Sequence, residues 1–484
     1  MSISKGTKTS SIETPGSKRR PVGGAYGVIH RLHTVAGVFV APLLVIAALS
    51  GFLYAFAPSL ENIVYRDVLT ARSEEPARPL SEQVAAAQAV HPDLELSAVQ
   101  VSEDGAATTR VLFNDPELKS SSYRQAVFVD PGSLDITGDV VQYGSSRALP
   151  LRTWISEGHR QLWLGEPGRI YSETAASWLG ILSLAGVWLW WARKKHNKRP
   201  TSARARARNL HSALGVWLLP GFLFLTVTGL TWSSLAGANI SNLRAELDWV
   251  QPTPSTDLAS TASTAPSSSA EHSEHSHHGH DTSAASSASM LTAQDSLAQI
   301  DTVLTASHEA GMSGIIELTV PATENPEENQ AWLVTEMREA WKLKNDAIAV
   351  DGTTGEIVDR VNHDDWPLAA KLSAWLIQLH MGTLFGWINQ VILGAIALGL
   401  LAVVVLGYRM WWLRGRGNVP RRLPAAGQWR KTKPTVVIGL IVFLVAYTLM
   451  APLFGISLVL FLVVDALVRA VRTRRSRTRV ALTY

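Results

Sequence analysis

Long apolar stretches separated by polar segments dominate the chain. A helix needs about 20 apolar residues to cross the hydrocarbon core of a bilayer, and four stretches meet this length: 34–57, 174–191, 212–236 and 385–410. A fifth stretch, 434–467, is too long for one span and is interrupted by Ala451-Pro452, so it predicts a hairpin of two helices. The pattern therefore predicts a polytopic α-helical membrane protein with about six transmembrane helices.

The basic residues indicate how these helices are oriented. Segments 193–210 and 409–433 each contain eight basic residues and no acid, and the N-terminal arm and the stretch 469–479 are also basic. Six spans place all four basic segments on one side, which the positive-inside rule makes cytoplasmic. Most acids lie in 58–158 and 237–379, which are then external. We therefore expect a multi-pass protein of the cytoplasmic membrane with both termini in the cytoplasm, surrounded by membrane lipid.

Composition adds two constraints. The pI near 9.2 follows from the basic cytoplasmic segments, so it is no argument for a nucleic-acid partner, and we expect none. The chain has no cysteine, which excludes disulfides, cysteine-ligated iron–sulfur clusters and covalently attached c-type haem. Any redox cofactor must therefore be held by other ligands.

The chain is internally duplicated. Counting from His33 and from His211, glycine recurs at +4, proline at +9 and glycine at +18. Counting from His159 and from His380, glycine recurs at +6 and +27, a Trp-Trp pair at +31 and +32, and arginine at +34. Each unit is a helix with a cytoplasmic-side histidine, an external domain, and a returning helix with an external-side histidine. Eighteen residues make about five helical turns, so we expect the last glycine of the first motif to lie on the face of its histidine.

The two external segments also resemble each other. Residues 125–140 and 346–361 each read as two short strands joined by a tight turn, which is typical of a hairpin. An amphipathic helix is expected before each sheet, near 81–90 and 292–310. We therefore expect two small extracytoplasmic α+β domains. The Ser-, Ala- and Thr-rich stretch 252–290 reads as a disordered insertion.

These expectations divide the chain into segments. The predicted membrane segments are 30–57, 159–195, 211–236 and 380–413, followed by a structural C-terminal hairpin at 434–470. The predicted external domains are 58–158 and 237–379. The predicted cytoplasmic segments are the arm 1–29, the loops 196–210 and 414–433, and the tail 471–484.

Four histidines are the candidate ligands. After folding, His33 and His211 lie near the inner membrane face, and His159 and His380 near the outer face. Imidazole is a common axial ligand of haem iron, and two imidazoles can hold one haem from opposite sides. We therefore expect two haems b, one near each face, although a single histidine at a helix end is more often an interfacial residue. His30 is an alternative to His33, because both lie on one helix face.

Six further histidines are weaker candidates. His363 lies in the acidic turn HDDWP and is expected at the surface. A histidine-rich tract inside the predicted insertion favours either weak metal capture or a solvated linker. Its members are His272, His275, His277, His278 and His280.

Several motifs in order resemble the PepSY-associated transmembrane helix family over most of residues 28–414. They are the H-x-x-x-G openings of the first and third spans, the segment 364–386, and the external VDP and VDG turns. The resemblance implies a bacterial inner-membrane protein, often iron-regulated, with periplasmic PepSY domains. Some members are siderophore-iron reductases that bind haem b through transmembrane histidines, and His33, His211, His159 and His380 occupy the matching positions.

We therefore expect an oxidoreductase that moves electrons outward to reduce ferric iron, held by a siderophore or another ferric chelate. No P-loop or Rossmann motif is present, so the electron donor is expected to be a quinol or another protein; the catalytic residues are unknown. One alternative is a haem-free regulator that modulates peptidases. Another is a metal-ion importer, which the scarcity of acids in the spans disfavours, Asp465 near a helix end being the exception.

Overall fold

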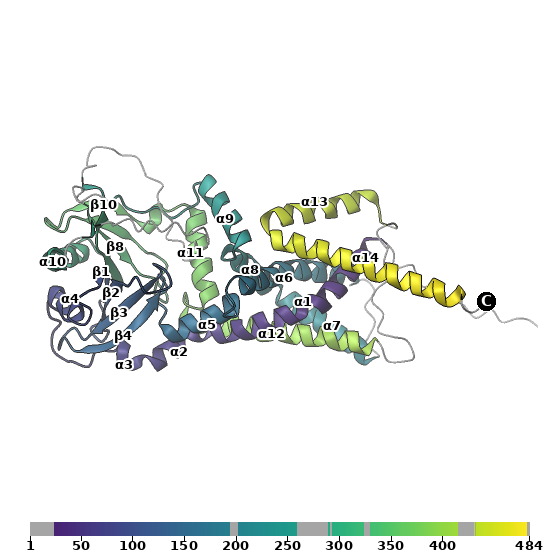
Figure 1. The fold of residues 1–484 in the computed structure, drawn as a ribbon, viewed down its shortest axis with the longest axis horizontal. Coiled ribbons are helices and arrows are strands. Elements are labelled where there is room, and N and C mark those ends of the chain that lie inside the picture. Colours follow the sequence, from purple (N-terminus) through teal and green to yellow (C-terminus); the bar gives the residue numbers. More distant parts are fainter. Residues whose placement is uncertain are drawn as a thin grey trace, which may run out of the picture.

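A bundle of helices and a β-sheet beyond one end of it make up the structure (Figure 1). This computed structural model describes residues 24–193, 202–258, 289–290, 293–323, 330–414, 430 and 432–481. The histidine-rich tract and most of the predicted insertion lie outside the described residues.

Within the described ranges, three helices are long and apolar enough to cross a membrane. They are α1 (Ala25–Ala55), α6 (Glu166–Arg193) and α12 (Gly386–Leu413). A fourth candidate is a pair, α7 (Ala203–Trp217) and α8 (Leu219–Thr231), bent by 58°. The predicted C-terminal hairpin consists of α13 (Pro434–Met450) and α14 (Pro452–Ala481), whose apolar parts are shorter. Helix length and composition in the described ranges thus give three candidate spans, or four if the bent pair is one span, and the count of six stays a prediction.

Two prolines at equivalent positions of the repeat differ in their effect on the helix, and only the third span is bent. Pro42 lies inside the continuous helix α1, whereas Pro220 lies near the start of α8. Proline lacks the N–H for the intrahelical hydrogen bond, so the helix can either continue with one bond missing or break. Only Pro220 is followed by glycine, and a Cβ on Gly221 would lie 2.9 Å from Ile396 of α12. The missing side chain therefore leaves room for Ile396 of α12 against the start of α8.

The four main spans pack so that the two halves interleave. Helix α1 packs along both α6 and α12, α7 packs on α12, and α8 packs on α6. Their shared core includes Ala36, Val40 and Leu44 of α1 together with Trp178 and Leu182 of α6. The first helix of each unit therefore packs against the returning helices of both units.

The C-terminal hairpin lies along the outside of this bundle (Figure 1). Phe454 is fully buried against Trp178, and the Trp178 indole donates to Ser457 Oγ at 2.9 Å. Asp465 forms an ion pair of 2.5 Å with Arg31 of α1. The one clear acid predicted in the spans therefore joins α14 to α1.

The sheet contains eight antiparallel strands in the order β10-β9-β8-β6-β1-β2-β3-β4. The first half supplies β1 (Glu95–Ser102), β2 (Thr109–Asn114), β3 (Tyr123–Val129) and β4 (Ile136–Tyr143). The second half supplies β6 (Ile315–Thr319), β8 (Trp332–Glu336), β9 (Ala347–Val350) and β10 (Ile357–Val361). Strands β5 (Ser289–Met290) and β7 (Ala322–Thr323) form a separate two-stranded sheet.

Both predicted hairpins and both predicted helices are present, but the halves share one sheet. Helices α4 (Leu80–Gln88) and α10 (Ala293–Glu309) pack on it in one continuous core, which includes Val84, Val99, Ile300 and Leu318. Strands β1 and β6 join the halves, with Val99 opposite Leu318. The edge of β1 in the first half and the edge of β6 in the second half therefore pair with each other. This pairing is favourable because unpaired backbone groups at a sheet edge are costly when buried.

Short helices connect the sheet to the bundle. They are α2 (Ala57–Val64), α3 (Arg66–Leu69), α5 (Pro150–Gln161), α9 (Leu235–Glu246) and α11 (Leu368–Met381), with a 3₁₀ turn at His363–Asp365. The returning spans therefore begin at Glu166 and Gly386, later than the predicted starts at 159 and 380. Left-handed residues separate them from α5 and α11, namely Leu162 and Gly382.

Candidate functional site

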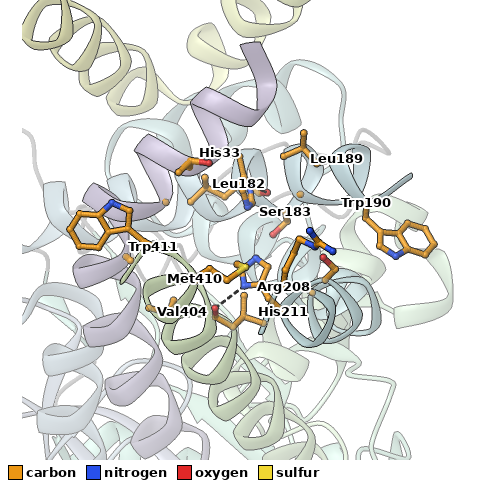
Figure 2. A pocket seen from close by; sticks show the side chains of 18 of the residues that line it. His33, Leu182, Ser183, Leu189, Trp190, Arg208, His211, Val404, Met410 and Trp411 are labelled. Atoms are coloured by element: carbon orange, nitrogen blue, oxygen red, sulfur yellow. Dashed lines mark hydrogen bonds between the residues drawn. The ribbon is translucent and has the colours of Figure 1, made fainter. Parts of the chain in front are cut away.

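The four predicted histidines form two pairs inside the bundle. His33 of α1 faces His211 of α7, with ring centres 6.2 Å apart and planes at 78°. Both rings line a cavity of about 290 Å³ (Figure 2). We call this the inner cavity, because its mouth lies at the predicted cytoplasmic ends of the helices.

The second pair lies toward the sheet. His159 and His380 each occupy the last turn of a short helix, α5 and α11 respectively, and their ring centres are 6.4 Å apart. Both rings line a second cavity of about 190 Å³, which we call the outer cavity. The structure thus brings together the histidines in the pairs that the repeat predicted.

In the inner pair, backbone carbonyls fix which nitrogen carries the proton. His33 Nδ1 lies 3.0 Å from Leu182 O, and His211 Nδ1 lies 2.9 Å from Val403 O. A carbonyl oxygen only accepts, so each Nδ1 donates. In the neutral ring that results, Nε2 keeps the lone pair with which imidazole ligates metals.

In the outer pair, hydroxyl groups have the same effect. His159 Nδ1 lies 3.0 Å from Ser50 Oγ, and His380 Nδ1 lies 2.6 Å from Thr228 Oγ1. Each hydroxyl already donates its proton within its own helix, Ser50 to Ile46 O and Thr228 to Phe224 O. Its oxygen therefore accepts from Nδ1–H, and Nε2 again keeps its lone pair.

The four Nδ1 partners, like the histidines they bind, occupy equivalent positions in the two halves of the repeat. Ser50 and Thr228 are 178 positions apart, as are His33 and His211. Leu182 and Val403 are 221 positions apart, as are His159 and His380. Sequence reasoning missed all four partners, although the repeat offset marks their positions as equivalent.

Aromatic residues cover the outer pair in the same repeated manner. Tyr54 stacks on His159 with ring centres 5.8 Å apart, and Trp232 meets His380 edge-on at 5.4 Å. Tyr54 and Trp232 are also 178 positions apart. An aromatic ring that lines the outer cavity therefore packs against each imidazole of this pair.

The glycines clear space for histidines of other helices. A Cβ on Gly186 would lie 3.1 Å from His33 Cε1, one on Gly407 would lie 3.7 Å from His211, and one on Gly51 would lie 3.1 Å from His159. Gly51 and His33 both line interior cavities from α1, as their expected shared face requires, but Gly51 clears space for His159 of α5 and not for the histidine of its own helix. Eighteen residues carry the chain across the bundle, so Gly51 reaches the outer cavity whereas His33 lines the inner one.

An apolar layer separates the two cavities. Leu44, Leu179 and Leu400, from α1, α6 and α12, line both of them. Ser50, which binds His159, follows His33 on α1 by 17 residues, which corresponds to about 25 Å of helix. The two histidine pairs thus lie nearly one bilayer core apart.

The other histidines lie elsewhere. His30 also lines the inner cavity, where its ring stacks on Tyr26 with centres 5.9 Å apart, while His33 is the ring that faces His211. The expectation that His363 lies at the surface is wrong: it is 3% exposed and packs against Trp366 and Trp375. The two tryptophans cover the ring, and burial together with Lys371 lowers the pKa of His363.

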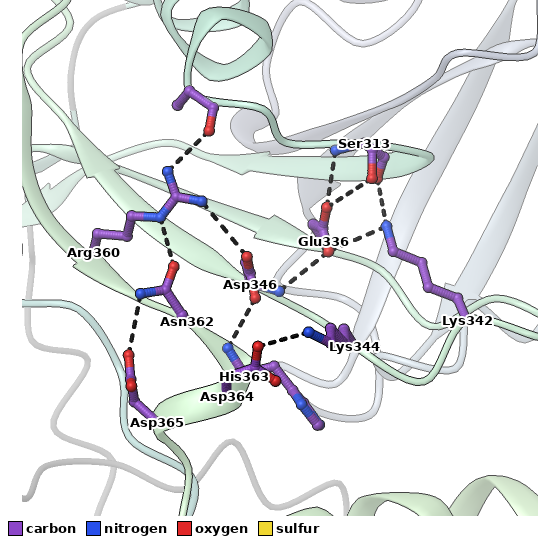
Figure 3. Close-up of polar contacts among 11 residues, drawn as sticks. Ser313, Glu336, Lys342, Lys344, Asp346, Arg360, Asn362, His363, Asp364 and Asp365 are labelled. Carbon is purple, nitrogen blue, oxygen red and sulfur yellow. Dashed lines mark hydrogen bonds and ion pairs between the residues drawn. The ribbon is translucent and has the colours of Figure 1, made fainter.

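A polar network joins strand β8 to the loops beside it (Figure 3). The buried Glu336 carboxylate accepts from the backbone N–H of Ser313 and of Asp346 and pairs with Lys342 at 3.2 Å. These bonds position the loop after β8, in which the Trp341 N–H donates to Leu384 O at 2.7 Å. Leu384 lies just after α11, which carries His380, so the network fixes the sheet relative to the outer pair.

Two imidazoles supply only two ligands to a metal ion. Across the described ranges, no three His, Asp or Glu side chains gather in a group that could hold a metal ion. The histidine-rich tract, predicted to capture metal weakly, lies outside these ranges. Each histidine pair therefore suits a metal whose remaining ligands come with it.

Comparison with known proteins gives one clear result. The family model described as the PepSY-associated TM region matches residues 30–414, which is most of the chain and includes all four paired histidines. Among curated proteins, none matches the sequence.

Proposed function

This chain belongs to the family of the PepSY-associated TM region, and from that premise we propose that it is a haem b protein that carries electrons across a membrane to ferric iron. The observation that carries the proposal is the duplicated ligand geometry. Each of two half-buried histidine pairs has its Nδ1 atoms occupied by hydrogen-bond acceptors at repeat-equivalent positions.

The spacing within each pair fits two ligands on opposite sides of one iron. An imidazole nitrogen lies about 2 Å from a metal it ligates and about 1 Å from the centre of its own ring, which sets opposed ring centres about 6 Å apart. The observed separations are 6.2 Å for His33 and His211 and 6.4 Å for His159 and His380. Each pair would therefore hold a haem iron between its two imidazoles, and His33, whose ring faces His211, is a better candidate than His30.

The surroundings of each pair also fit a flat apolar macrocycle. Gly37 and Gly215 line the inner cavity, and Gly51 and Gly229 line the outer one, so no side chain occupies the cavities from these four positions. Bound haem b would supply a one-electron Fe(III)/Fe(II) couple at each pair. The protein's part is to fix each imidazole through Nδ1 and to exclude water with the leucine layer.

The position of the outer pair suits a reaction on the sheet side. The outer cavity reaches Tyr143, at the end of β4, and Arg160, whose guanidinium donates to the Tyr143 hydroxyl at 3.0 Å. We propose that the two halves of the shared sheet are PepSY domains that cap this cavity and receive a ferric siderophore or another ferric chelate. Hard oxygen chelators hold Fe(III) more firmly than Fe(II), so one added electron loosens the iron.

We further propose six spans in a bacterial inner membrane, with both termini in the cytoplasm and the sheet outside. With a quinol as donor, oxidation to the quinone releases two electrons and two protons, and two ferric chelates each take one electron. A protein donor of single electrons is the alternative. The iron leaves as Fe(II).

The acidic residues of the spans do not support the metal-importer alternative. Glu173 of α6 is buried, but its two carboxylate oxygens accept from the N–H groups of Leu235 and Ala236 at the start of α9. Asp465 is paired with Arg31. Both acids thus have structural partners away from the two cavities.

The test is a visible spectrum of the full-length protein, purified from haem-replete cells, before and after dithionite, with a pyridine haemochrome assay. We expect a sharp reduced α-band and two b-type haems per chain. His211→Ala and His380→Ala should each remove one haem and abolish reduction of a ferric chelate, whereas His91→Ala, in the external sheet, should remove none.

A colourless wild-type protein would overturn the proposal and leave the haem-free regulator as the leading function. Two haems in both His→Ala variants would show that the haem is held elsewhere.

A further inference from the structure

The mouth of the inner cavity differs between the two halves of the repeat. Arg204 and Arg208 of α7 line it on one side, and the positions 178 residues earlier on α1 are Tyr26 and His30, which line it on the other. Arg193 and Arg414, which are repeat equivalents at the ends of α6 and α12, also line this mouth. Four arginines from three helices therefore line the cavity that contains His33 and His211, and Figure 2 shows Arg208 beside His211.

The described residues at the mouth of the inner cavity carry positive charge. Among the described residues that line it, none is Asp or Glu. The neighbouring sequences, 194–201 and 415–429, contain no acid either. The acid Asp465 is engaged by Arg31. The mouth is thus a concentration of positive charge at the rim of an apolar pocket.

We infer that these arginines bind the two carboxylates of a porphyrin held between His33 and His211, and so orient it with its acidic edge toward α7. This inference rests on the proposed function and adds the orientation of the inner group. Haem is apolar except for its two propionates, so it sits with its body in the pocket and its carboxylates at a wet, basic rim. The planar guanidinium matches a carboxylate with two parallel hydrogen bonds.

The difference between the two halves of the repeat favours α7 as the helix that the acidic edge of the porphyrin faces. A basic cluster that served only topology would not need to line the ligand cavity, and a third arginine of α7, Arg206, does not line it. Arg204 and Arg208 are four residues apart, so they project from one face of α7. His211 follows Arg208 by three residues on the same face of α7. Both arginines therefore lie on the helix face that carries the ligand histidine.

A lipid phosphate is the other anion with the same chemistry, and the test separates the two. The double variant Arg204→Gln/Arg208→Gln is compared with wild type and with Arg206→Gln as the matched control. Haem per chain and the two midpoint potentials are measured in phospholipid-free detergent and in nanodiscs that contain anionic lipid.

We expect the double variant to lower the potential of the centre that His211→Ala removes, or to lose that haem, so that the content falls from two toward one. Losing positive charge beside the carboxylates favours the more positive Fe(III) state, which lowers the potential. The outer centre and Arg206→Gln should stay at wild-type values in both media. Arg204→Lys/Arg208→Lys keeps the charge but not the fork, so we expect an intermediate shift.

Unchanged content and potentials in the glutamine variant would overturn the inference while the proposed function stands. A change seen only with anionic lipid would assign the arginines to lipid phosphate and overturn it as well. A wild-type protein without haem would remove the proposed function itself.

Discussion

At the residue scale, the informative atoms are the Nδ1 partners of the four histidines. A histidine ligand whose other nitrogen donates to a fixed acceptor has a defined tautomer and ring orientation. Carbonyl oxygens serve the inner pair and hydroxyl oxygens serve the outer pair. The outer pair is therefore the one that a single conservative substitution can alter, since a backbone carbonyl cannot be removed by mutation.

We expect Ser50→Ala and Thr228→Ala to weaken haem binding at the outer pair by about 10- to 100-fold, the usual effect of losing such a partner. Each variant leaves an Nδ1–H without its acceptor, so the ring also turns more freely. The measurement is haem retention during dilution or competition with apomyoglobin. Ser172→Ala is the control, because Ser172 lines the same cavity but donates to Arg169 O. Equal loss in all three variants would contradict a role for the Nδ1 bond.

At the scale of elements, the close approach of helices depends on glycine opposite histidine. This contact was not evident from the sequence, because helical periodicity reports which residues share a face of one helix and says nothing of the neighbouring helix. The repeat pairs Gly186 with Gly407, yet the clearances differ, at 3.1 Å to His33 and 3.7 Å to His211. The halves are thus equivalent in register but not in packing distance.

This difference predicts unequal effects of the same substitution. Gly186→Ala must push His33 or α6 aside, which costs about 1–3 kcal/mol as overpacking does in other cores, whereas Gly407→Ala makes an ordinary contact. Both alanines gain the same helix propensity, so the difference between them isolates the contact. Thermal unfolding in detergent and the haem content of the inner pair are the measurements. Equal behaviour of the two variants would contradict the packing argument.

At the scale of the whole molecule, the bundle and the sheet are each built from both halves. Helix α1 packs on α6 and α12, and β1 pairs with β6, so neither half is complete without the other. The C-terminal hairpin, which has no repeat counterpart, is joined to this body by Arg31 and Asp465. The side chains of this pair are 17% and 18% exposed, so the pair is largely shielded from water.

We expect Asp465→Asn to destabilise the protein by about 1–3 kcal/mol, because it leaves the Arg31 guanidinium without its charged partner. The double variant Arg31→Gln/Asp465→Asn should lose less than the sum of the single changes, since the two groups are coupled. The readout is unfolding in a denaturing detergent. Additive losses would show that the pair does not hold the hairpin to α1.

The sequence alone was sufficient for the features that repeat along the chain. Apolar length predicted the spans, turn residues predicted both hairpins, and the offsets of 178 and 221 residues predicted which histidines are equivalent. Such signals are local or periodic, so they survive without knowledge of the fold. His363 shows their limit: an acidic, proline-containing turn indicated a surface position, but Trp366 and Trp375 bury its ring.

Only the tertiary structure decided what faces what. It determined that the two external halves share one sheet, that Pro220 marks a bend where Pro42 does not, and that Ser50 and Thr228 hold the outer histidines. Each of these depends on contacts between segments more than 100 residues apart. Packing between helices and pairing between strand edges select such contacts, because they bury apolar surface and satisfy backbone groups that no single element can satisfy by itself.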